Sequence, residues 1–85
     1  MLGTISRQIR ETQDLREALS DYGFVPSSSQ EFDTVGDEPR RVKHEYWSRG
    51  SRRVTLETDA ETGEPLNLIG AWAIQRPDFI ELSFN

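Results

Sequence analysis

The segment 12–22 carries apolar residues at the spacing of one helix face. They recur at i, i+3, i+4 and i+7: Leu15, Ala18, Leu19 and Tyr22. Thr12 can serve as the N-cap, because its hydroxyl can accept a hydrogen bond from a free amide of the first turn. Gly23 suits the left-handed position that follows a helix, and Pro26 cannot continue one. The pattern therefore predicts a helix over residues 12–22.

The segment 3–9 fits two structures. Ile5 and Ile9 are compatible with one face of a strand or with two further turns of the helix. A single long helix would place this pair about 100° away from Leu15 and Leu19, which requires a broad buried face. A short strand at 3–9 is therefore preferred.

After the helix, the apolar period changes from helical to alternating. Residues 26–29 predict a polar loop, and Gly- and Pro-containing turns separate the alternating runs that follow. Strands are predicted over residues 31–35, 41–48, 52–58, 66–75 and 79–84. The fold class is α+β, with one helix packed on a four- to five-stranded antiparallel meander sheet.

Alternation also assigns the faces of the strands. Val42 and Tyr46 are expected to face the helix, and Trp47 to lie on the opposite face. That outer face would also carry an apolar patch, Ile69, Ala71 and Ala73. The predicted core consists of Leu15, Leu19, Val54, Leu56, Leu68 and Trp72.

Length and composition limit the functional classes. A chain of 85 residues suits one domain with one core. It has no cysteine, which excludes disulfides and thiolate metal sites, and no apolar run of the length that a signal peptide or a membrane span needs. We therefore expect a cytoplasmic protein that does not enter a membrane. No cofactor or metal motif is present, and self-association stays open because so small a core is marginally stable.

Charge is segregated along the sequence. Residues 40–53 contain six Arg and Lys residues against one acid, Glu45, and so carry a net charge of +5. The whole chain carries −5, which leaves −10 for the remaining residues. The candidate partner-binding residues are Arg41, Lys43, Trp47, Arg49, Arg52 and Arg53.

This basic hairpin admits three interpretations. It can dock on an acidic protein surface, where Arg and Trp are frequent anchors. It can contact nucleic acid, with arginines on phosphates and Tyr46 or Trp47 as a stacking face. Its arginines can also be solvated strand ends that pair with Glu45 and Glu57. Protein docking ranks above nucleic acid because the acidic remainder of the chain repels a polyanion.

His44 is the single histidine, and it raises the alternative of an RNase-like enzyme. The order Tyr22-Gly23-Phe24, His44 and Arg52-Arg53-Val54-Thr55 resembles HicA-type mRNA-interfering toxins. The chain departs from that pattern, because Val42-Lys43 precedes His44 where a Gly-Ser pair would be expected and strands replace the closing helix. The sequence therefore favours a small non-catalytic binding protein, acting as a regulator, an inhibitor or an antitoxin-like protein.

Overall fold

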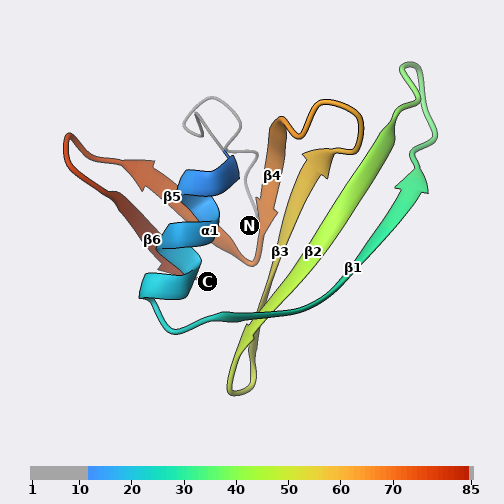
Figure 1. Ribbon diagram of the computed structural model, residues 1–85. Helices are drawn as coiled ribbons and strands as arrows, with labels where there is room; N and C mark the ends of the chain where they lie inside the picture. The colour runs from blue at the N-terminus through green and yellow to red at the C-terminus, as the bar shows by residue number, and fades with distance from the viewer. Residues whose placement is uncertain (1–11, 85) are drawn as a thin grey trace.

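The computed structural model describes residues 12–84 and shows an α+β fold (Figure 1). Its elements are α1 (Thr12–Asp21), β1 (Val25–Asp33), β2 (Arg41–Arg49), β3 (Arg52–Asp59), β4 (Pro65–Ile69), β5 (Ala71–Gln75) and β6 (Ile80–Phe84). Strands β1 to β4 form an antiparallel four-stranded meander, and β5 and β6 form a separate two-stranded sheet. The predicted fold class is confirmed, whereas the strand expected at 3–9 lies outside the described residues.

Helix α1 ends as its sequence predicts. Gly23 has a φ of +88°, its amide donates to the carbonyl of Ser20 (3.0 Å), and the amide of Phe24 donates to that of Leu19 (2.9 Å). These two bonds define a Schellman motif, which satisfies carbonyls that the last helical turn leaves unpaired. At the other end Thr12 is the first helical residue, and its hydroxyl donates to the carbonyl of Gly63 (2.6 Å). The helix is thereby tied to the turn between β3 and β4.

Strands β2 and β3 form the hairpin that the sequence predicts. Arg49 lies opposite Arg52, and Gly50 takes a φ of +59° in the turn between them. A left-handed residue in a two-residue turn matches the twist of the flanking strands, which is why Gly is favoured there.

The predicted faces of β2 are wrong. Trp47 lies opposite Val54 and Glu45 lies opposite Leu56, and directly opposed residues share a face of the sheet. Trp47 is 5% exposed and belongs to the core, while Tyr46 lies on the face that α1 does not cover. Both faces of β2 carry large apolar side chains, so alternation alone could not decide which one the helix covers.

The predicted strand 66–75 is interrupted at Gly70. This glycine has a φ of +98° and separates β4 from β5. The interruption shifts the inward phase by one residue, so that Leu68 is followed by Ala71 and Ala73 in the core. Trp72, which an unbroken strand would bury, is half-exposed and packs against the edge of the core.

Strand β1 covers both the segment 26–29, expected to be a polar loop, and the first part of the strand predicted at 31–35. It pairs with β2 from Val25 to Asp33, with a bulge between Pro26 and Ser28. A strand at the edge of a sheet needs no alternating apolar pattern, and Pro is tolerated there and at bulges. The first half of β1, whose side chains are all exposed, therefore escapes detection by hydrophobic period.

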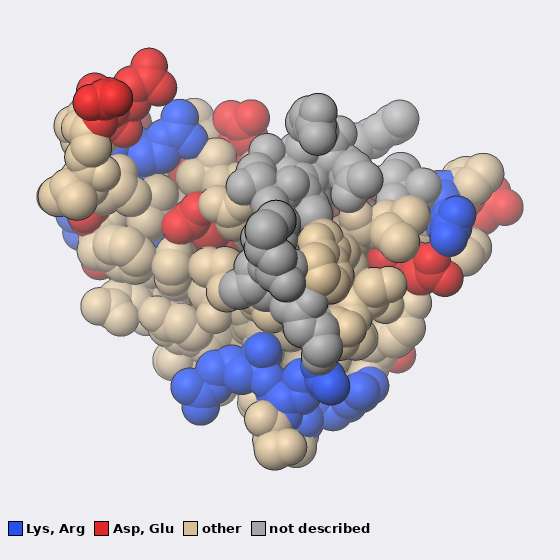
Figure 2. All heavy atoms as spheres, turned by 180° about the vertical axis from the view of Figure 1, so that it is seen from behind, with Lys and Arg blue, Asp and Glu red and all other residues tan. Residues whose placement is uncertain are grey.

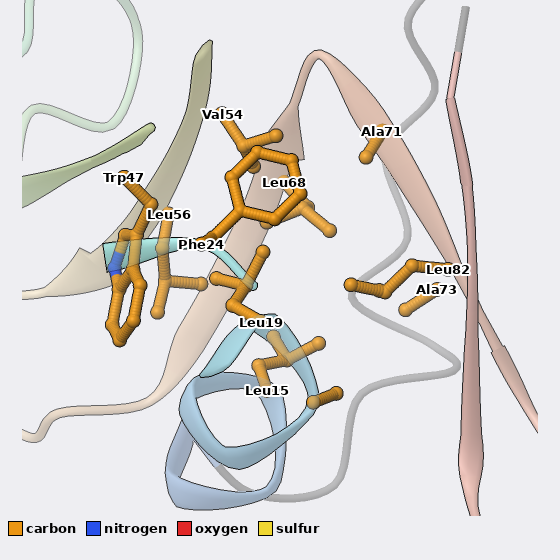
Figure 3. Close-up of a cluster of buried hydrophobic side chains, with 11 residues drawn as sticks. Leu15, Leu19, Phe24, Trp47, Val54, Leu56, Leu68, Ala71, Ala73 and Leu82 are labelled. Atoms are coloured by element: carbon orange, nitrogen blue, oxygen red, sulfur yellow. The ribbon is translucent and has the colours of Figure 1, made fainter. Parts of the chain in front are cut away.

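The core lies between the two sheets, with α1 in the wedge that they form (Figures 1 and 3). Five of the six predicted core residues are fully buried: Leu15, Leu19, Val54, Leu56 and Leu68. The other members of the buried cluster drawn in Figure 3 are Ala18, Phe24, Trp47, Ala71, Ala73 and Leu82. Of the two strands of the second sheet, β6 lies closer to α1.

Replacing Gly70 tests the interruption. A Cβ at this position would lie 2.9 Å from the carbonyl oxygen of Arg53, in addition to the strain of a positive φ. Gly63 has a φ of +78° with nothing within 4 Å and is the matched control. Gly63→Ala should lower the free energy of unfolding by about 1–2 kcal/mol. Gly70→Ala should cost about 1–3 kcal/mol more, measured by urea unfolding. Equal losses would show that β3 does not constrain Gly70.

Candidate functional site

The structure divides the six predicted partner-binding residues into three groups. Trp47 is buried in the core and is not available to a partner in this fold. Arg41 and Lys43, near the base of the β2–β3 hairpin, form ion pairs within the molecule. Arg49, Arg52 and Arg53 lie at its turn and are exposed. We call these last three residues the arginine tip.

Neighbouring carboxylates offset the positive charge at the base of the hairpin. Arg41 lies 3.1 Å from Asp33 and 3.5 Å from Glu31, both on β1, and Arg40 lies 3.9 Å from Asp59. Hydrogen bonding to Asp33 and the charges of both β1 acids raise the pKa of Arg41. These exposed pairs add little stability, but they remove much of the positive potential from this end of the hairpin.

Two arginines of the tip rest on a pair of stacked aromatic rings. The rings of Phe24 and Phe84 lie 5.3 Å apart with 22° between their planes. The guanidinium of Arg49 lies 5.1 Å above the ring of Phe24, and that of Arg52 lies 5.0 Å above the ring of Phe84. Cation–π attraction therefore holds both charged groups over one aromatic platform.

Arg49 is also bound to the end of α1. Its Nη1 donates to the carbonyl of Tyr22 (2.7 Å), and a Cβ on Gly23 would lie 3.3 Å from its Cδ. The carboxyl end of a helix dipole attracts a cation, so this contact favours the observed arginine conformation. The sequence did not predict this platform. Phe24 was recognised only as part of the helix stop, and no local pattern indicates that Phe84, near the other end of the chain, would stack on it.

Arg53 points to the opposite face of the hairpin, because it pairs with Ser48 rather than with Arg49. Among the residues that the structure describes, no carboxylate lies within ion-pair distance of Arg49 or Arg53. Figure 2 shows Lys and Arg side chains gathered at the end of the molecule where Figure 1 places this turn. The arginine tip thus presents positive charge on both faces of the hairpin.

A half-buried ion pair between Arg16 and Glu45 joins α1 to β2. Arg16 donates from Nε to Glu45 Oε1 (3.0 Å) and from Nη2 to Oε2, while Trp47 Nε1 lies 3.3 Å from Oε1. Burial acts to raise the pKa of Glu45, but the hydrogen bonds and charge of Arg16, with Trp47 and Lys43, outweigh it and lower the pKa. Glu45 therefore stays ionised although it is 9% exposed.

His44 lies on the face of the sheet that α1 does not cover. Its Nε2 lies 2.7 Å from Glu57 Oε2, and Asn67 donates to the other oxygen of Glu57 (2.7 Å). Its ring also meets Phe32 edge-on, with centroids 4.7 Å apart. Glu57 and Glu45, which the sequence offered as partners for the hairpin arginines, instead bind His44 and Arg16.

An acidic groove runs between α1 and the turn that joins β5 to β6. It encloses about 400 Å³ and is lined by four carboxylates, Asp14, Glu17, Asp21 and Asp78, with Phe79 exposed beside them. Within residues 12–84, no group of three or more His, Cys, Asp or Glu side chains is arranged to hold a metal ion. The groove concentrates negative charge along α1, and its end at Asp21 and Tyr22 lies beside Arg49, which binds the carbonyl of Tyr22.

The chain matches no protein-family model, and comparisons with curated proteins and with solved structures find no significant similarity. In the part of the chain that the structure describes, no helix is long and apolar enough to cross a membrane.

A double-mutant cycle tests the ion pair of Arg16 and Glu45. Arg16→Met should lower the free energy of unfolding by about 1–3 kcal/mol, because it leaves a half-buried carboxylate short of a donor. Adding Glu45→Leu should recover much of this loss, giving a coupling of about 1–2 kcal/mol in urea unfolding. The exposed pair of Arg76 and Glu81 (2.7 Å) is the control, with an expected coupling below about 1 kcal/mol.

The same coupling should depend on pH. The lowered pKa of Glu45 contributes stability above the pKa of the unfolded chain, and this contribution is lost as the pH falls through the folded-state pKa. The coupling of Arg16 to Glu45 should therefore shrink between neutral and strongly acidic pH. A coupling that is constant over this range would contradict an ionised Glu45.

Proposed function

We propose that this protein is a small non-catalytic binding protein that docks its arginine tip onto an acidic surface of another protein. A regulator, an inhibitor or an antitoxin-like protein would act in this way, and the proposed setting is the cytoplasm. The observation that carries the proposal is the stacking of Arg49 and Arg52 on the rings of Phe24 and Phe84.

Preorganised arginines suit protein recognition. A flexible arginine loses conformational freedom on binding, and this loss reduces affinity. Arg49 already has its conformation restricted by Phe24 and by the carbonyl of Tyr22, so less freedom remains to be lost. Planar guanidinium groups can also form paired hydrogen bonds with carboxylates, which favours an acidic partner surface.

The charge distribution supports a protein partner over nucleic acid. Arg40, Arg41 and Lys43 are offset by nearby carboxylates, so fewer of the hairpin cations remain to neutralise phosphates. The acidic groove, which reaches Tyr22 beside Arg49, adds repulsion against a long polyanion. Nucleic-acid binding through residues 40–53 remains the alternative function, and an RNase-like role of His44 ranks below it.

Two pairs of variants with equal charge change test the role of the tip. Arg49→Gln with Arg53→Gln should abolish capture of one specific protein from a nuclease-treated lysate of the source organism, quantified by mass spectrometry. Arg40→Gln with Arg41→Gln, at the base of the hairpin, should retain it. Both double variants must first show cooperative thermal unfolding. Equal loss of capture in the two pairs would show that net charge, and not the tip, controls binding.

Direct titration decides between the partner classes. The wild-type protein should bind labelled random RNA and DNA negligibly at about 200 mM salt, because few phosphate contacts are available. Gel-shift titrations at about 50 and 200 mM salt measure this. Submicromolar affinity at the higher salt would replace the protein-docking proposal with the nucleic-acid function.

A further inference from the structure

Strand β1 forms one edge of the four-stranded sheet, and no described strand lies on its outer side. All its side chains are exposed except that of Phe32, which is half-buried. Exposed edges are usually protected by Lys, Pro, bulges or covering segments. In β1 the proline and the bulge lie at the beginning, and the stretch 28–33 pairs regularly with β2 and contains no Lys, Arg or Pro. This stretch is a template for another strand.

We propose that β1 pairs in antiparallel fashion with β1 of a second copy of this chain. The two copies of Gln30 lie opposite each other, and the two-fold axis passes midway between them, which we call an axis through Gln30. The axis is perpendicular to the sheet, so the two four-stranded sheets become continuous and both α1 helices lie on the same face. This inference does not depend on the proposed function, because the pairing stretch 28–32 lies opposite residues 42–46 of β2 and includes no residue of the arginine tip.

Strand geometry and charge select the register. Directly opposed residues must share a face of the sheet, so one residue has to lie opposite its own copy. An axis placed between two successive residues would set side chains of different faces against each other. Within the regular stretch 28–33, an axis through Gln30 or through Glu31 pairs the largest number of residues. The second choice sets Glu31 against its own copy, which like-charge repulsion disfavours. The axis through Gln30 instead sets Glu31 against Ser29 and Ser28 against Phe32.

The two acidic side chains of β1, Glu31 and Asp33, do not disfavour this register by repulsion. Glu31 and Asp33 already pair with Arg41 of their own chain, at 3.5 and 3.1 Å. A second copy therefore meets an edge whose acids are offset. On the other face, the hydroxyl of Tyr46 lies 3.5 Å from Gln30 Oε1 and leaves the amide hydrogens of Gln30 available to the matching side chain across the axis.

The same axis explains two exposed apolar side chains. Val25, the first residue of β1, is 61% exposed, and Val35, beyond the last residue of β1, is 97% exposed. Antiparallel pairing brings the end of β1 that carries Val25 in one copy toward the end that leads to Val35 in the other, twice per dimer. Burial of both valines removes apolar surface from water and so favours association. Edge pairing and these contacts together commit the surface to a second copy of the chain.

Cysteine cross-linking tests the register directly, because the chain has no cysteine of its own. Gln30→Cys places two thiols opposite each other across the axis, within the Cα separation that a disulfide requires. Under mild oxidation this variant should form a disulfide-linked dimer. Ser28→Cys on the same face and Ser51→Cys at the hairpin turn should not, because their copies lie far apart. Equal cross-linking of the three variants would overturn the proposal.

Charge substitution tests it without covalent chemistry. Gln30→Lys and Gln30→Glu each place like charges across the axis, and each should weaken the dimer about fivefold or more in sedimentation equilibrium. An equimolar mixture of the two variants should restore association. A wild-type protein that sediments as a monomer at the highest soluble concentration overturns the inference. A dimer that survives both single substitutions overturns it equally, because another surface would then hold the copies together.

Discussion

The architecture depends on the backbone of Gly70. A positive φ turns the chain away from the four-stranded sheet, and the carbonyl of Arg53 leaves no space for a side chain at this position. A residue with a Cβ would force either the turn to open or β3 to move. Because the chain turns here, β5 and β6 form their own sheet, and α1 is enclosed between two layers instead of lying on one.

This constraint also shapes the arginine tip. Strand β6 carries Phe84 to the ring of Phe24, which follows the end of α1. The platform under Arg49 and Arg52 therefore exists only when the second sheet has folded back over the helix. Phe24 and Phe84, which are far apart in the sequence, together support Arg49 and Arg52, so the stability of the core and the geometry of the candidate surface are coupled.

Sequence patterns predicted the local features and missed those that depend on contacts between distant segments. The helix stop at Gly23 and the hairpin turn at Gly50 follow from neighbouring residues, and both are observed. The face of Trp47 was assigned wrongly, because the choice between two apolar faces depends on where α1 packs. Composition alone shows that residues 40–53 are basic. Only the fold shows that Arg41 is paired with Asp33 whereas Arg53 is exposed.

The shift of phase at Gly70 is the feature on which the second sheet depends, and Trp72 reports on it. An unbroken strand in phase with Leu68 would bury Trp72, whereas the interrupted strand leaves it half-exposed. Trp47, which is buried opposite Val54, is the buried reference. Acrylamide quenching of the variants Trp72→Phe and Trp47→Phe measures the accessibility of the tryptophan that remains in each. The interruption predicts that Trp47 emits at shorter wavelength and is quenched more weakly than Trp72. Stronger quenching of Trp47 than of Trp72 in folded variants would contradict it.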